Sequence, residues 1–325
     1  MASLDALATV APVLLLFGLG AVLRAGGVLR PTTIDDLRRL VLTVALPSAL
    51  FLTFLRVEVE SRYLAIVATV FVACVAMLVA GPLVGRALGI RSPLVGPLMT
   101  GFEAGMLGYG VFGAVFGVDA LYRFAIIDIG QVVFVFFVLV VVLARQSAAR
   151  PPTLLETAVS FARTPVILAI AGGIAAGRLG LGPTLDSNPA GEAVLTTLAL
   201  LAALTTPLIA LVLGASIRFA RGDLGRPVRT VAARMTAWVA LAAVFNAVVI
   251  EGLLGLDRLF SAAVFMMAVL PPPFVIPLYQ PADPAAEPDR AYVTNTLSVA
   301  TVATMVAVCV IAAAYANQAS AGGLG

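Results

Sequence analysis

The stretch Val269-Leu270-Pro271-Pro272-Pro273-Phe274-Val275-Ile276-Pro277 lies inside an apolar segment, residues 260–280. Three consecutive prolines remove three backbone N–H donors and clash with the preceding helical turn, so no regular helix passes through this stretch. A second apolar segment, residues 94–117, has a cluster of glycines, each of which costs a helix about 1 kcal/mol relative to alanine. The sequence therefore predicts two interrupted helices. The expected helix-breaking residues are Gly105, Gly108 and Gly110 in the first and Pro271, Pro272, Pro273 and Pro277 in the second.

The composition assigns the chain to a class. Of its 325 residues, 61% are hydrophobic and 11% are charged, whereas a soluble domain has roughly 25% charged residues. A membrane-spanning helix needs about 20 apolar residues, and the chain has room for ten. We therefore expect an all-α membrane protein with ten transmembrane helices. The expected spans are residues 7–23, 37–55, 63–85, 94–117, 120–143, 164–179, 193–216, 229–250, 260–280 and 291–315.

The basic residues orient these spans. All 20 are arginine, and with the N-terminus outside only five lie on the outer side, while the other fifteen lie on the inner side. This asymmetry is typical of membrane proteins, whose inner loops are enriched in arginine and lysine. We expect a multi-pass protein of the inner (plasma) membrane with both termini outside. The five outer arginines are Arg56, Arg62, Arg123, Arg178 and Arg258.

The two halves of the chain correspond to each other. A polar linker, residues 146–162, separates a first five-helix repeat, residues 1–145, from a second, residues 163–325. Because each half has an odd number of spans, the halves have opposite orientations. Pro47 in the second span corresponds to Pro207 in the seventh, and the two interruptions lie in the fourth and ninth spans. Inverted repeats with broken helices are typical of secondary transporters, which hold substrate at the repeat interface.

Each interruption also has a simpler explanation. The glycines of residues 94–117 are compatible with a close-packed helix face of small residues, and the prolines of residues 260–280 with a mere kink. Two breaks at matching places in the two halves favour true interruptions. Broken helices leave half-helix N-termini with free N–H groups and partial positive charge near the membrane midplane, which suit an anionic substrate.

Polar residues inside the spans are the candidate site. Glu103 lies about 15 Å along its span, near the middle of the bilayer, where a charge costs about 2.5–3.5 kcal/mol. It is either a carboxylate that takes up a coupling proton or Na⁺, or a structural hydrogen-bond acceptor at the break. Asp128 and Gln131 share a helix face one turn apart, and the tenth span is polar at a similar depth. We favour one site over separate interhelical contacts.

The expected site has two overlapping sets of residues. The residues expected to contact substrate are Glu103, Gly105, Met106, Gly108, Tyr109, Pro272, Pro273, Phe274 and Val275. The residues expected to bind the coupling ion are Glu103, Asp128, Gln131, Asn295 and Ser298. Arg234, near the inner end of the eighth span, is expected to be structural, with its side chain reaching to the inner membrane surface.

Several functions conflict with the composition. The chain has no histidine, no lysine and only two cysteines, Cys74 and Cys309, each in an apolar run. Imidazole catalysis, a histidine or thiolate metal site and an ATP-binding lysine loop are therefore excluded. We expect no enzyme activity, cofactor, metal or nucleic-acid partner. The remaining alternative is a transporter-like membrane sensor without transport activity, although the sequence contains no long polar segment for a soluble output domain.

Four features of the sequence resemble those of the auxin efflux carrier (AEC) family. This family includes plant PIN carriers and bacterial malonate and malate permeases and belongs to the bile/arsenite/riboflavin transporter superfamily. Residues 40–47 (LVLTVALP) are similar to its second helix, and residues 207–216 (PLIALVLGAS) to its seventh. The Gly105-x-x-Gly108 and Leu270-Pro271-Pro272 breaks are similar to its crossover helices. Residues 126–131 (IIDIGQ) resemble the fifth helix of some bacterial members.

The resemblance implies a fold and a mechanism. Helices one, two, six and seven would form a scaffold, often a homodimer, and helices three to five and eight to ten a moving transport domain. The substrates would be organic anions moved by elevator-like alternating access. This chain has Glu103 where the family usually has an asparagine at the helix-four crossover. It has Phe274, Val275 and Ile276 in the region where the family has an asparagine at the helix-nine crossover. A carboxylate at the crossover suggests proton or cation coupling, or a less acidic substrate.

Overall fold

The computed structural model describes residues 2–147, 150–280 and 286–319, and every regular element in these ranges is a helix. Residues 148 and 149 of the expected linker and residues 320–325 at the C-terminus lie outside the described residues. Within the described ranges, six helices are long and apolar enough to cross a membrane, and a pair bent by 62°, Leu154–Ala162 with Pro165–Arg178, would be a seventh. The chain is therefore an all-α, multi-pass membrane protein. The six are Pro31–Arg56, Tyr63–Ala87, Val118–Gln146, Pro189–Ser216, Gly225–Leu253 and Glu287–Tyr315.

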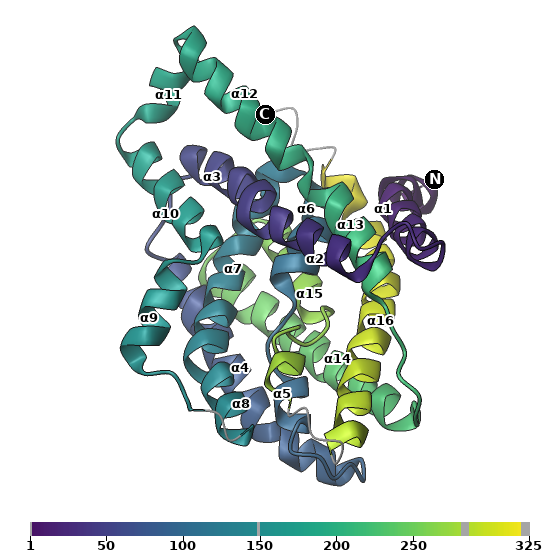
Figure 1. The fold of residues 1–325 in the computed structure, drawn as a ribbon. Coiled ribbons are helices and arrows are strands. Elements are labelled where there is room, and N and C mark those ends of the chain that lie inside the picture. The colour runs from purple at the N-terminus through teal and green to yellow at the C-terminus, as the bar shows by residue number, and fades with distance from the viewer. Residues whose placement is uncertain (1, 148–149, 281–285, 320–325) are drawn as a thin grey trace.

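The helices pack in two groups. In the first, α1 lies along α13, α10 and α12 pack on α3, and α2 contacts α13. Figure 1 shows α1, α2, α3, α12 and α13 in the upper half of the view. This group contains α1 (Ala2–Ala25), α2 (Pro31–Leu40), η1 (Val41–Ala45), α3 (Leu46–Arg56), α10 (Pro165–Arg178), α11 (Leu181–Asp186), α12 (Pro189–Ala203) and α13 (Thr205–Ser216).

In the second group, α4 packs on α5 and α7, and α15 packs on α7, α14 and α16. The groups meet where α1 contacts α16 and where α6 contacts α13, and α9 (Leu154–Ala162) leads from the second group into α10. The second group contains α4 (Tyr63–Ala87), α5 (Val95–Met99), η2 (Ala104–Gly108), α6 (Tyr109–Phe116), η3 (Val118–Ala120), α7 (Leu121–Phe134), η4 (Val135–Leu139), α8 (Val140–Gln146), α14 (Gly225–Phe245), η5 (Asn246–Leu253), α15 (Arg258–Ala268), η6 (Ile276–Tyr279) and α16 (Glu287–Ala319).

The first interruption lies earlier in the chain than the sequence predicts. Helix α5 ends at Met99, residues 100–103 are not helical, and the chain resumes as the π-helical turn η2 and then α6. Gly101 has a φ of +61°, which residues with a side chain rarely adopt. The prediction that Gly105, Gly108 and Gly110 break the helix is wrong, since all three lie in helical turns.

Two of these glycines allow close packing instead. A Cβ atom on Gly108 would lie 2.4 Å from Cζ of Phe124 in α7 and 2.8 Å from Cδ1 of Leu270, and one on Gly110 would lie 2.5 Å from Cγ2 of Ile209 in α13. The close-packed glycine face is therefore the correct explanation for both residues.

The second interruption lies at the proline run. Helix α15 ends at Ala268, and Pro271, Pro272 and Pro273 have no regular structure, as predicted. Pro277 lies within the single 3₁₀ turn η6 that follows, so it is part of a helical turn rather than of the open stretch. The residues after the prolines thus form one short turn and not a second half-helix of any length.

Candidate functional site

Glu103 joins the two interruptions to each other. Its backbone N–H donates to the carbonyl oxygen of Pro271 at 2.9 Å, and the backbone N–H of Phe274 donates to its Oε2 at 2.7 Å. Its Oε1 accepts from the N–H of Met106 at 3.2 Å and so caps η2. One residue of the first break therefore binds the second break both at its first proline and at the residue that follows its last proline. Both carboxylate oxygens are acceptors for backbone N–H groups that lack a partner within a helix.

The interruptions also touch directly at Gly101. A Cβ atom there would lie 2.7 Å from Cγ of Pro273. A side chain at residue 101 would therefore push the two breaks apart, besides being strained at its positive φ. We call residues 98–103 and 270–274 together the crossing. Glycine at residue 101 meets both of its requirements, the absence of a Cβ atom and a positive φ.

Arg234 of α14 binds the other side of the crossing. Its side chain is 0% exposed, and its guanidinium donates to the carbonyl oxygens of Leu98 at 3.1 Å, Thr100 at 3.3 Å and Leu270 at 3.3 Å, and also to that of Gly101. These carbonyls lie in the last turn of α5 or just beyond the C-terminal ends of α5 and α15, which have partial negative charge and no helical donors. The expectation that Arg234 reaches the membrane surface is wrong, because four main-chain acceptors hold it inside.

Aromatic residues enclose this arginine. The Arg234 guanidinium lies over the Phe102 ring, 5.2 Å from its centroid. Trp238, one turn further along α14, packs its ring 4.5 Å from that of Phe102 and donates its Nε1–H to the carbonyl of Met99 at 2.8 Å. The Arg234–Trp238 pair therefore holds the end of α5 by hydrogen bonds and by ring contacts, with water excluded.

Helix α7 braces the first break. Asp128 accepts from the Tyr109 hydroxyl at 2.9 Å and from Nε2 of Gln131 at 2.8 Å, while Oε1 of Gln131 accepts from the N–H of Phe102 at 3.2 Å. Asp128 and Gln131 are 3% and 4% exposed. The structure thus brings these two predicted residues to the first break. Gln131 binds Phe102, just before Glu103, and Asp128 binds Tyr109, after it.

The two predicted residues of α16 hydrogen-bond to a loop and not to the breaks. Asn295 exchanges two hydrogen bonds with the main chain of Ala220, at 2.8 and 3.2 Å, and Ser298 donates to the carbonyl of Arg218. They hold the loop of residues 217–224, and among the described residues neither has a hydrogen bond to Glu103 or Asp128, so the ion site shared with them stays a prediction. The residue of α16 that does bind the second break is Thr304, whose hydroxyl donates to the carbonyl of Val269.

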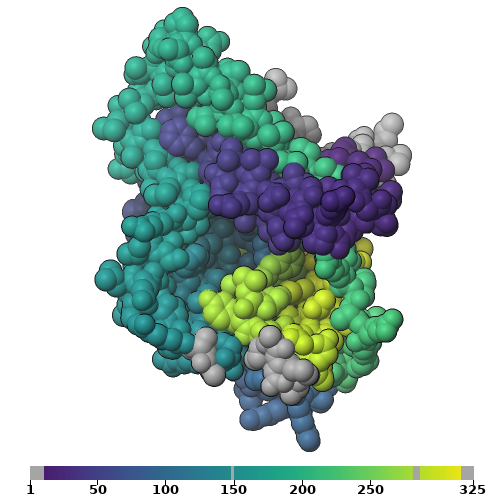
Figure 2. Space-filling view, in the orientation of Figure 1, coloured from purple at the N-terminus to yellow at the C-terminus, as the bar shows by residue number. Residues whose placement is uncertain are grey.

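A cavity of about 280 Å³ lies beside the second break. Arg38 of α2 and Arg218 bring positive charge to it, and the Nε of Arg38 is buried without a hydrogen-bond partner among the described residues. In Figure 2 the purple α2 region lies above the yellow-green segment that contains the second break. The lining residues are Arg38, Leu213, Ser216, Ile217, Arg218, Phe274, Pro277, Leu278, Thr294, Leu297, Ser298 and Thr301.

The cavity includes few of the predicted substrate contacts. Phe274 lines it, next to the backbone N–H that binds Glu103. Glu103, Gly105 and Val275 are partly buried and do not line it. Five further predicted residues are buried among other side chains, and the Tyr109 hydroxyl already donates to Asp128. These five are Met106, Gly108, Tyr109, Pro272 and Pro273.

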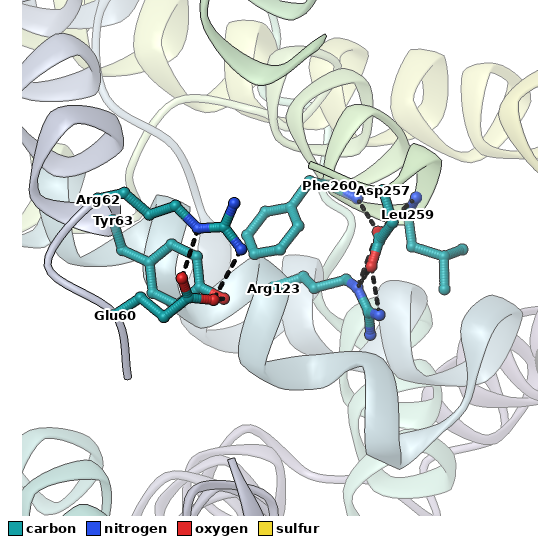
Figure 3. Close-up of polar contacts among 7 residues, drawn as sticks. All are labelled: Glu60, Arg62, Tyr63, Arg123, Asp257, Leu259 and Phe260. Carbon is teal, nitrogen blue, oxygen red and sulfur yellow. Dashed lines mark hydrogen bonds and ion pairs between the residues drawn. The ribbon is translucent and has the colours of Figure 1, made fainter. Parts of the chain in front are cut away.

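A second polar cluster, which we call the outer cluster, ties the N-terminal ends of α4, α7 and α15. Arg123 donates from Nε to both carboxylate oxygens of Asp257, at 2.9 and 3.0 Å, and Asp257 caps α15 through the N–H groups of Leu259 and Phe260 (Figure 3). Arg62 pairs with Glu60 at 2.7 Å. Here charged side chains pair with each other at an exposed surface.

The roles that Arg38, Arg218, Arg234, Trp238 and Thr304 have at the cavity or against the crossing were not predicted from the sequence. One signal was present, because Arg234 and Trp238 are four residues apart and so lie on one helix face. Thr304 likewise follows Thr301 by one turn. The carbonyl groups that Arg234 binds left no signal, since every residue carries one.

The site contains no recognisable metal centre. Among the described residues, no group of three or more histidine, cysteine, aspartate or glutamate side chains could hold a metal ion. Comparison of the chain with protein-family models and with curated proteins finds no match. The crossing and the adjacent cavity are therefore the features from which a function has to be inferred.

Proposed function

We propose that this protein is a secondary active transporter of a small organic anion, built from ten spans in two inverted five-helix repeats. The observation that carries the proposal is the crossing, where Glu103 hydrogen-bonds two interrupted helices together. Interrupted helices at membrane depth are tolerated only where the open backbone is buried in protein or lines a cavity. Where they occur in pairs, they are typical of transporters with a central substrate site.

In the proposal, ten spans would be formed from the helices described above, singly or in pairs. They are α1, α2 with α3, α4, α5 with α6, α7 with α8, α10, α12 with α13, α14, α15 with η6, and α16. The first group of helices would be the scaffold, and the second would move against it as the transport domain. The 280 Å³ cavity supports this division, because α2 and α13 line one side and the second break and α16 line the other. The resemblance to the AEC family implies the same division.

The chemistry of the cavity supports an anionic substrate. The cavity is lined by two arginines, Arg38 and Arg218, and by four hydroxyl-bearing residues. These four are Ser216, Thr294, Ser298 and Thr301. The carboxylate that pairs with Arg38, Asp35, is 70% exposed, so that ion pair is weakened by solvent. A carboxylate substrate would find charge-assisted donors here, and the volume is close to the lower end of ligand pockets, roughly 300–1,000 Å³.

Glu103 is the proposed coupling group. In its ionised form it accepts backbone N–H bonds from Met106 and Phe274. A protonated carboxyl oxygen is a poorer acceptor, so proton uptake would loosen the bond between the two breaks as substrate binds. Asp128 is bonded to Tyr109 and Gln131, and it would keep the first break in shape while Glu103 titrates.

Reconstitution into liposomes tests the proposal. A panel of mono- and dicarboxylates is offered with and without an imposed pH gradient. Uptake of at least one carboxylate by the wild type is expected, with Arg38→Ala raising KM about tenfold, which corresponds to about 1.4 kcal/mol. Arg39→Ala is the matched control, since Arg39 is exposed and does not line the cavity. No carboxylate-dependent flux in either direction would refute the transporter, and full gradient-driven uptake by Glu103→Gln would refute the coupling role.

A further inference from the structure

We propose that the guanidinium of Arg234 occupies a cation site at the crossing and replaces a bound alkali-metal ion there. Removing its guanidinium would then leave a site for a free monovalent cation at the crossing. The consequence for transport rests on the proposed function, whereas the binding site itself does not. The transporter would need no sodium ion at the crossing, and the proton would be the remaining coupling ion.

The acceptors around Arg234 are those that bind cations in other membrane proteins. Unwound backbone carbonyls and the C-terminal ends of half-helices coordinate coupling cations in transporters with broken helices. The guanidinium binds carbonyls of this kind from both breaks: Leu98, Thr100 and Gly101 from the first and Leu270 from the second. Four partial negative charges thus converge on one buried point.

The charge of Arg234 has no carboxylate partner. None of the ion pairs found within the described ranges includes it, and arginine cannot be deprotonated in proteins. The carbonyl dipoles and the Phe102 ring therefore balance the charge. An arrangement that binds a full positive charge with main-chain dipoles and one aromatic ring is one that a free cation of suitable size can also satisfy.

A substitution that removes the guanidinium tests this inference directly. Arg234→Ala deletes the cation and leaves the four carbonyls facing an emptied volume. The melting temperature of the purified variant is measured in millimolar guanidinium, methylguanidinium, sodium or potassium chloride, with choline chloride as the large-cation reference. We expect a saturable rise of about 5 °C with at least one of the small cations, at roughly 100 times its Kd.

Arg229→Ala is the matched control. Arg229 lies on the same helix and also binds two carbonyls, those of Gly225 at 3.2 Å and Leu88 at 2.9 Å, but it is exposed to solvent. Neither this variant nor the wild type is expected to respond to the small cations. A failure of every small cation to stabilise Arg234→Ala, or an equal effect on Arg229→Ala, would overturn the inference.

Two further measurements apply if Arg234→Ala does not fold. The wild type should melt at the same temperature in sodium and in choline chloride, because its site is already filled, and a saturable stabilisation by sodium would overturn the inference. Arg234→Lys should fold with intermediate stability, since an ammonium keeps the charge but has only three donors. These stability readouts need no substrate. Cation rescue without carboxylate flux would therefore sink the proposed function and leave this inference standing.

Discussion

The crossing and the outer cluster solve the same problem, a charge near a helix end, in opposite ways. At the crossing, Arg234 is 0% exposed and binds only main-chain carbonyls, while Glu103 binds only main-chain N–H groups. In the outer cluster, Arg123 and Asp257 are 17% and 46% exposed and bind each other (Figure 3). Inside the bilayer, helix ends have no water to satisfy them, so charged side chains replace it. In the outer cluster the charges pair with each other, and Asp257 also caps α15.

The difference has an energetic consequence. An ion pair at an exposed surface contributes about 0–1 kcal/mol, because solvent screens it. A buried polar group left without a partner costs about 1–3 kcal/mol, and more if it is charged. Substitutions of similar shape should therefore have large effects at the crossing and small ones in the outer cluster.

The largest effect is expected for Arg234→Met, compared with Arg123→Met. Methionine keeps much of the side-chain length but offers no donors, so four buried carbonyls lose their partner. We expect a loss of about 3–5 kcal/mol in the free energy of unfolding for Arg234→Met, because each buried carbonyl left without a donor costs about 1–3 kcal/mol, and under about 1 kcal/mol for Arg123→Met. Denaturant unfolding in lipid–detergent micelles measures both. Equal losses would remove the distinction between the two regions.

Glycine packing in η2, next to the crossing, comes next. Gly108→Ala places a Cβ 2.4 Å from Phe124 and 2.8 Å from Leu270, so those side chains must move, which costs about 1–3 kcal/mol. Gly105→Ala is the control, since its Cβ would meet only Leu42, at 3.6 Å. That variant should stay within about 0.5 kcal/mol of the wild type. Melting temperatures compare the pair, and a larger loss for Gly105→Ala would contradict the packing.

Glu103→Gln should reduce stability by about 1–2 kcal/mol. The amide has one acceptor oxygen, so its NH₂ group must face the N–H of either Met106 or Phe274, donor against donor. Isothermal unfolding measures the loss, and pH-gradient-driven uptake is measured on the same preparation. Unchanged stability would mean that the bond between the breaks contributes nothing to their alignment.

Asp257 separates capping from ion pairing in the outer cluster. Asp257→Ala removes the cap of α15 and should cost about 1 kcal/mol. Asp257→Asn keeps an N-cap acceptor for Leu259 and Phe260 but removes the charge that Arg123 binds. The asparagine variant should therefore lose only a few tenths of a kcal/mol. If both variants lose the same stability, the ion pair is worth more than solvent screening allows.

The smallest effect concerns pH. The hydrogen bond from Arg62 lowers the pKa of the Glu60 carboxyl below its ordinary value of 4.5. The folded protein therefore binds fewer protons here than the unfolded chain, and the stabilisation is present above pH 4.5 and lost as the pH falls through the folded pKa. The difference in melting temperature between wild type and Glu60→Gln should be small at neutral pH and vanish in acid. A difference that grows in acid would contradict the sign.

Sequence reasoning succeeded where the cause was local. Three prolines forbid a helix wherever they occur, and the chain is open at Pro271 to Pro273. Glycine has two uses, flexibility and close approach, and only its neighbours reveal which applies. Gly101 breaks the helix at a positive φ, whereas Gly108 fits against Phe124. For the same reason the first break was placed too late in the chain.

The polar residues show the same limit. Asp128 and Gln131 were grouped correctly at the first break, because they are one turn apart on one helix. Asn295 and Ser298 have the right depth and composition, yet they bind the loop of residues 217–224. Depth along a span says how far a side chain lies from the membrane surface but not which neighbour it faces.

The amino-acid sequence alone determined the membrane class, the helical content and the proline interruption, since composition and backbone chemistry act within a few residues. Only the tertiary structure decided what the buried charges do. Arg234 reaches a carbonyl 136 residues away in the chain, at Leu98, and that carbonyl is available only because α5 ends there. Such a partner is set by where two helices stop and meet, which is a property of the packed chain and not of any segment of it.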